Sequence, residues 1–158
     1  MPAYVVAQLV GAVLGVFAAN AMFGEPLLMV PTHQRSGASQ VFSEFVATFG
    51  LVSVIWGCAR RRASMVPFAV AAYIVAAYWF TPSTSFANPA VTIARAFTNT
   101  FAGIRPSDVP GFLVGQGAGA AAATLLFRWL VPPVQVERQA IVDDLLATQS
   151  LNRERLVR

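Results

Sequence analysis

The sequence predicts an all-α membrane protein with four transmembrane helices and one shorter, re-entrant half-helix. The chain has 158 residues, of which 56% are hydrophobic and 11% are charged, whereas charged residues make up about 25% of an ordinary soluble domain. Four apolar runs approach or reach the length of about 20 residues that a spanning helix needs: 3–23, 41–59, 65–81 and 109–131. A fifth apolar run, 88–102, is too short to cross.

The fifth run begins with residues that favour a helix start. Asn88 can cap the first turn, and Pro89 occupies the first helical position, where an N–H has no helical partner in any case. Gly103 is predicted to end the helix in a left-handed conformation. The 13 residues from Pro89 to Phe101 would span about 20 Å, against a hydrocarbon core of about 30 Å. Backbone at membrane depth is stable only inside protein or beside a water-filled cavity, so this run predicts a pore.

The long runs carry features that predict orientation and packing. Three consecutive arginines, Arg60 to Arg62, follow the second run and place that end in the cytoplasm, so both termini are predicted to be cytoplasmic. Glu44 lies within the second run, where an ionisable side chain is normally held by partners inside the bundle; the alternative is a position near the interface, in reach of water. Small residues in the first and fourth runs would let helices pack closely: Gly11, Gly15, Gly115 and Gly119.

Parts of the first and fourth runs resemble each other. The segment 7–12 is AQLVGA and the segment 115–120 is GQGAGA, with the two glutamines 108 positions apart. In the predicted topology the first run points outward and the fourth points inward. Similar segments in antiparallel elements are typical of an inverted repeat.

Composition and motifs argue against several functions. All eleven basic residues are arginines and the net charge is +4, but no basic face is interleaved with aromatic residues, so nucleic acid is not an expected partner. The one cysteine, Cys58, excludes an internal disulfide and a multi-cysteine metal site. No nucleophile paired with a base and no carboxylate dyad accompanies the predicted pore, so we expect no enzyme, cofactor or metal. His33 is expected to be a solvated loop side chain, with a ligand or switch role as the alternative.

The fifth run also resembles a known family. The triplet Asn88-Pro89-Ala90, preceded by TSFA and opening a short helix, resembles the signature loop of aquaporins, the major intrinsic protein family. The segment EFVATF that starts at Glu44 is similar to the family pattern in which a glutamate accepts hydrogen bonds from backbone donors of the pore loop. The resemblance covers 4–129 and implies an aquaporin-like right-handed bundle, with this supporting role for Glu44.

The resemblance also implies a function. It implies a passive channel for water and small neutral solutes in the lipid bilayer of a bacterial inner (plasma) membrane, assembled as a homotetramer. The matching part corresponds to the last four of the family's six spans, so we expect a mis-set start codon or a truncated gene. The alternative is a non-conducting membrane fragment that lacks the first half-channel. A secondary transporter, the third interpretation, needs coupling-ion carboxylates at mid-membrane, for which Glu44 is thin support.

Three positions implied by the resemblance would set the width of the pore. Aquaporins usually have arginine directly after the triplet, and here that residue is Val91. Arg95, one helical turn later, either partly replaces the missing arginine as a cation-repelling group or extends to the outer interface. Family spacing places the filter residue of the third span at Ala76, with Ala77 as the neighbouring possibility. Small residues here imply a wide pore that suits glycerol or, by resemblance to a branch associated with arsenic resistance, arsenous acid.

The predicted organisation is a partial channel domain at 1–131 and a cytosolic tail at 132–158. The tail is polar and charged, with a few apolar residues at helical spacing. It is expected to be either a short amphipathic helix near the membrane or a solvated segment.

Overall fold

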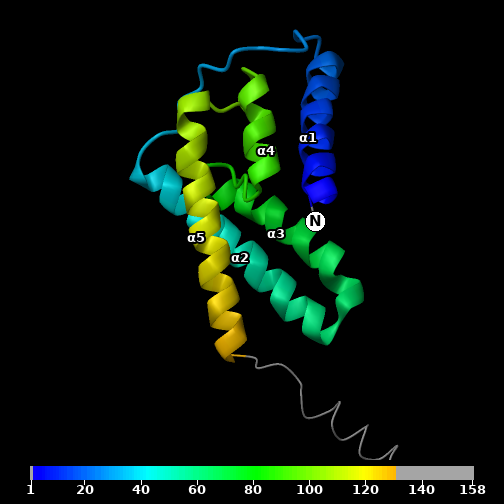
Figure 1. Cartoon of the computed structure of the whole chain (residues 1–158), viewed down its shortest axis with the longest axis vertical. Helices are drawn as coiled ribbons and strands as arrows, with labels where there is room; N and C mark the ends of the chain where they lie inside the picture. Colours follow the sequence, from blue (N-terminus) through cyan, green and yellow to red (C-terminus); the bar gives the residue numbers. More distant parts are fainter. Residues whose placement is uncertain (1, 131–158) are drawn as a thin grey trace, which may run out of the picture. The chain divides into compact units, whose positions relative to one another are not determined.

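The computed structural model describes residues 2–130; the predicted tail at 132–158 lies outside the described residues. Figure 1 shows that this part of the chain consists of helices joined by loops. The long helices are α1 (Pro2–Met22), α2 (Ala38–Arg61), α3 (Val66–Phe80) and α5 (Val109–Leu130). The short elements are α4 (Pro89–Ala94) and three 3₁₀ turns: η1 (Ala63–Met65), η2 (Arg95–Phe97) and η3 (Pro106–Asp108).

The predicted all-α fold with four span-length helices is confirmed. Within residues 2–130, four helical segments are long and apolar enough to cross a membrane: Pro2–Met22, Ala38–Arg61, Ala63–Phe80 and Pro106–Leu130. Most of α1 and α3 is exposed, and their exposed side chains include large apolar ones such as Leu14, Phe68 and Trp79. Apolar outer surfaces suit a helix that faces lipid or another apolar helix rather than water.

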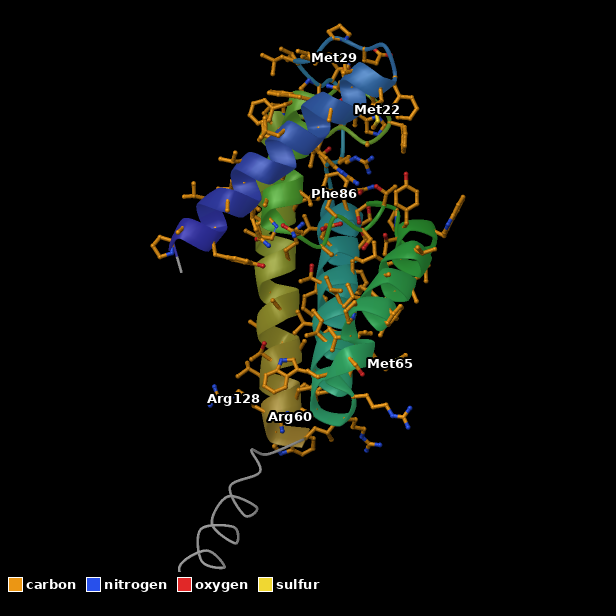
Figure 2. The ribbon with its side chains drawn as sticks, turned by 90° about the vertical axis from the view of Figure 1, so that its right-hand side faces the viewer. Met22, Met29, Arg60, Met65, Phe86 and Arg128 are labelled. Carbon is orange, nitrogen blue, oxygen red and sulfur yellow. The ribbon has the colours of Figure 1, made fainter. Side chains whose placement is uncertain are left out.

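The second and third helices form a hairpin. The connection between α2 and α3 is short, and Pro67 lies in the first turn of α3, where proline is tolerated. Ala47 on α2 and Ala77 on α3 are both fully buried, and the Tyr73 hydroxyl of α3 donates to the Ala47 carbonyl at 3.0 Å. Figure 2 labels Arg60 near the end of α2 and Met22 at the end of α1, and the two residues lie at opposite ends of the view.

Two glycines allow α5 to approach α2 closely. A Cβ atom at Gly115 would lie 2.5 Å from the Val41 carbonyl oxygen, and one at Gly119 would collide with the Phe45 carbonyl. Gly11 and Gly15 on α1 differ, because no atom among the described residues lies within 4 Å of a Cβ placed there. The close packing expected at Gly11 and Gly15 is therefore not made within residues 2–130.

The half-helix is shorter than expected. Helical structure begins after Asn88 and ends with η2 at Phe97, not near 102, which gives a length of about 15 Å. Thr98 is already extended, and its hydroxyl donates to the Asn20 side chain of α1 at 2.8 Å. The predicted left-handed exit at Gly103 is wrong, since the described glycines with positive φ are Gly24 and Gly37. Glycine is needed at position 103 for another reason: the Thr98 carbonyl approaches so closely that a Cβ atom there would collide with it.

Candidate functional site

The loop that precedes α4 has an unusual backbone. Thr84, Ser85 and Ala87 have φ values of 60°, 47° and 45°, although none of them is glycine. The left-handed region costs an L-residue roughly 1–2 kcal/mol. Such strain persists only where the surrounding structure fixes the loop, and it concentrates at functional sites. We call the segment 81–88 the pore loop.

Glu44 of α2 fixes the pore loop from inside the bundle. Its side chain has no solvent exposure. One carboxylate oxygen accepts from the Phe86 backbone N–H at 2.9 Å and the Ser83 hydroxyl at 2.6 Å. The other accepts from the Ala87 N–H at 2.9 Å and the Gln116 side-chain amide at 2.6 Å. Four donors around one carboxylate replace the water that burial removes, and hydrogen bonds to a charged group are the stronger kind.

Asn88 begins the half-helix. Its Oδ1 accepts from the backbone N–H groups of Ala90 and Val91 at 2.8 and 3.3 Å, and Pro89 follows at the first helical position. Because Oδ1 is occupied by the cap, the Nδ2 amide is the part of this half-buried side chain that is suited to donate to a solute oxygen.

Gln116 connects the half-helix to α5. Besides its bond to Glu44, the Gln116 amide donates to the Thr92 hydroxyl at 2.8 Å, and that hydroxyl donates to the Asn88 carbonyl at 2.9 Å. Gln116 is 1% exposed and Thr92 is fully buried. In the sequence, Gln116 stands out only as part of the internal repeat. The signal for its role is a polar side chain within a run of small residues, which must find partners inside the bundle.

A cavity of about 270 Å³ lies between α1 and the half-helix. Its lining residues are Ala12, Gly15, Val16, Ala19, Asn20, Val91, Ala94, Arg95, Thr98, Thr100 and Ala102. The structure therefore brings Val91 and Arg95 together on one face of the half-helix, as their spacing indicates. Ala76 does not line this cavity and is exposed on α3, whereas its neighbour Ala77 is fully buried. The structure therefore does not bring Ala76 to the cavity that Val91 and Arg95 line.

The Arg95 side chain points back into the protein. Its guanidinium carbon lies 4.2 Å from the centroid of the Phe86 ring, within the range of cation–π attraction. Its Nη1 atom is buried and has no hydrogen-bond partner among the described residues. Phe86 is itself 3% exposed and packs edge-on against Phe112 at 5.1 Å between centroids. Figure 2 marks Phe86 near the end of α2 at which the pore loop lies.

Arg35 was not predicted as a site residue. It lies in the loop between α1 and α2, yet only 5% of it is exposed. Its guanidinium donates to the carbonyls of Ser83, Phe101 and Gly103 at 3.0, 2.7 and 2.9 Å. Burial lowers the pKa of this guanidinium, nearby Tyr78 and Glu44 oppose the shift, and arginine stays protonated. No local pattern could reveal the role, because its partners are backbone carbonyls distant in sequence.

His33 is exposed, as a solvated loop side chain would be. Within residues 2–130, no group of three or more His, Cys, Asp and Glu side chains could hold a metal ion.

Fold and site together define a multi-pass helical membrane protein whose strained loop and short helix are held inside the bundle by a buried carboxylate. No family model matches the chain, and no solved structure matches it. The chain is 52% identical over 133 residues to aquaglyceroporin AqpS of Rhizobium meliloti (strain 1021). The aligned region covers 84% of this chain and 57% of that relative. This similarity supports membership of the aquaporin, or major intrinsic protein, family. The chain spans little more than half the length of the relative it matches.

Proposed function

We propose that this chain forms part of the wall of a passive transmembrane channel for water and small uncharged solutes, and that it is not an enzyme. The observation that carries the proposal is the fixation of the pore loop by Glu44, which holds the start of an Asn88-capped half-helix in place. Strained backbone with this much buried support suits a surface that must stay open and rigid for a solute.

Selectivity in the proposed channel comes from hydrogen bonding and electrostatics. The start of the half-helix carries a partial positive charge, which disfavours cations and proton carriers. The Asn88 amide donates to the oxygen of a passing water or alcohol. Val91 beside it is apolar and offers no competing polar group. Neutral solutes therefore pass, whereas ions would lose hydration that these groups do not replace.

The residues at the proposed filter favour solutes larger than water. Val91 and Ala76 are both smaller than the arginine and polar side chains of a narrow constriction, so the path is wide and weakly polar. The related AqpS is named an aquaglyceroporin, which supports glycerol as a solute here. Arsenous acid, a neutral trihydroxide, is a second candidate because, like glycerol, it is small and uncharged and carries three hydroxyl groups.

Membrane placement and assembly form part of the same proposal. By the positive-inside rule, Arg60 to Arg62 at the end of α2 support a cytoplasmic position for that end. In this orientation α1 begins in the cytoplasm and the half-helix enters from the outside. The proposed location is the bacterial inner membrane. We further propose a homotetramer with one path in each subunit, which the exposed apolar faces of α1 and α3 would accommodate.

Stopped-flow swelling of proteoliposomes tests the function. The protein is reconstituted and exposed to gradients of glycerol and arsenous acid, with empty liposomes as the control. We expect both solutes to enter faster than in empty liposomes, without dependence on an ion gradient. Fast water flow with exclusion of both solutes would refute the wide filter. No flow of any kind would favour a non-conducting fragment, and uptake that depends on an ion gradient would indicate a transporter.

A further inference from the structure

Arg35 joins backbone segments on both sides of the half-helix. Ser83, whose carbonyl it binds, precedes α4 in the pore loop, while Phe101 and Gly103 follow η2. The guanidinium offers five donors in one rigid plane, so a single side chain can hold several carbonyls at once. The backbone N–H of Arg35 donates to the buried Asp108 carboxylate at 2.8 Å, so its own main chain is also fixed.

The same guanidinium shares an aromatic ring with Arg95. The Arg35 guanidinium carbon lies 5.1 Å from the Phe86 ring centroid, and that of Arg95 lies 4.2 Å from it. Both distances fall within the range of about 6 Å over which a ring attracts a cation. Phe86 is held at its backbone by Glu44 and at its ring by Phe112. The ring is therefore a rigid support that contacts both arginines.

Arg95 depends on this support more than most arginines do. No carboxylate pairs with it among the described residues, its Nη1 atom has no hydrogen-bond partner there, and the Phe86 ring is the contact that orients it. Arg95 also borders the cavity beside Val91, so its orientation decides where a positive charge lies along the proposed path.

We infer that Arg35 is a positioning residue that holds Phe86, and through it Arg95, at the cavity, so that small cations are excluded although the residue after the triplet is Val91. The inference rests on the proposed function and extends it, because it names the residues that confer cation exclusion. Arg35 contacts no solute. It acts by holding the ring against which Arg95 packs.

Urea and the guanidinium ion form a suitable pair of probes, because they have nearly the same size and shape and differ in charge. The complete protein is reconstituted in proteoliposomes, and the ratio of guanidinium to urea permeability is measured; glycerol replaces urea if the wild type excludes urea. Arg95→Met is expected to raise this ratio by about tenfold, the size of effect that removing one nearby charge produces. Arg35→Met and Phe86→Leu are expected to raise it in the same direction, because each releases the Arg95 guanidinium from its fixed position at the cavity. Arg62→Met is the control for the loss of one positive charge, because Arg62 is exposed just beyond the end of α2 and does not line the cavity, and it is expected to leave the ratio at the wild-type value.

The double variant separates positioning from simple charge. If Arg35 acts through Arg95, adding Arg35→Met to Arg95→Met raises the ratio much less than the product of the single effects. A full multiplicative effect would show two independent charges and overturn the inference. A merely structural Arg35 would lower the yield of folded protein and leave the ratio unchanged in what folds, which also overturns it.

Folding failure does not remove the test. If Arg35→Met does not accumulate, Phe86→Leu and Arg35→Lys decide, because lysine keeps the charge but cannot hold three carbonyls with one rigid plane. An unchanged ratio in both variants overturns the inference and leaves the proposed function intact. A wild-type protein that admits neither urea nor glycerol contradicts the proposed function itself, and the inference fails with it.

Discussion

The carboxylate of Glu44 on α2 and the side-chain amide of Gln116 on α5 lie 2.6 Å apart in the interior of the bundle. Neither side chain has more than 1% exposure. This contact joins two spans to each other, and the remaining bonds of both side chains hold the pore loop and the half-helix. Stability of the bundle and geometry of the proposed path therefore depend on the same few hydrogen bonds.

Glu44→Gln is expected to destabilise the protein by about 3 kcal/mol or more. The amide keeps the size of the side chain, but its NH₂ group faces donors, which leaves buried N–H groups unsatisfied at a cost of about 1–3 kcal/mol each. Thermal unfolding in detergent measures the effect. Glu25→Gln, in the exposed loop after α1, is the matched control and should unfold like the wild type. Equal stability of the two variants would show that Glu44 does not hold the loop.

Gln116→Glu is expected to be more harmful than Gln116→Leu. The leucine variant removes two hydrogen bonds and leaves the Glu44 oxygen with one donor fewer, whereas the glutamate variant places a second carboxylate beside the first in a site without water. The fraction of protein that elutes as a single folded species after extraction measures this order. The reverse order would contradict the assignment of Gln116 as a donor to Glu44.

Ala87→Gly is expected to be tolerated or to stabilise by up to about 1 kcal/mol, because glycine adopts a positive φ without a Cβ clash. Ala87→Val should destabilise the protein, since a β-branched side chain fits a positive φ poorly and position 87 is buried. Ala94→Gly, in the half-helix, is the control, and there glycine should destabilise by about 1 kcal/mol. Melting temperatures measure both glycine variants, and we expect their changes in stability to have opposite signs. If both glycine variants lose stability equally, the pore loop does not carry the strain described.

Gly115→Ala and Gly119→Ala are expected to destabilise the protein because each added methyl group would meet the backbone of α2. Overpacking of this kind costs about 1–3 kcal/mol. Gly117→Ala lies in the same helix with open space around it and should be neutral or stabilise by up to about 1 kcal/mol. Chemical unfolding in detergent compares the three. A loss of stability at Gly117 equal to that at Gly115 would mean that α5 does not face α2 as described.

Local sequence signals predicted the parts of this structure that local chemistry controls. The lengths of the apolar runs predicted the four long helices, and the order Asn88-Pro89 predicted the cap and start of α4. The end of the half-helix was not predicted, because it depends on Thr98 bonding to Asn20, 78 residues earlier. Gly103 was misinterpreted because what requires glycine there is the close approach of the Thr98 carbonyl and not a positive φ.

Arg35 shows what sequence reasoning could not reach. An arginine in a polar loop ordinarily faces water, and its three carbonyl partners become neighbours only after the half-helix has folded back. The resemblance to aquaporins drew attention to Asn88, Val91 and Arg95, which lie along the half-helix. It gave no indication that a loop between α1 and α2 would supply a second guanidinium to Phe86.

Thiol labelling at the start of the half-helix tests the central claim most directly. A Cys58→Ser background removes the native cysteine of the chain. In this background Val91→Cys, at the cavity, is compared with Thr92→Cys, on the buried side of the same helix. With the complete protein in proteoliposomes, a water-soluble, membrane-impermeant thiol reagent is predicted to label position 91 and to slow glycerol entry, while position 92 stays unlabelled. Protection of position 91 from aqueous reagent on both sides of the membrane would contradict the claim that this half-helix lines a path for solutes.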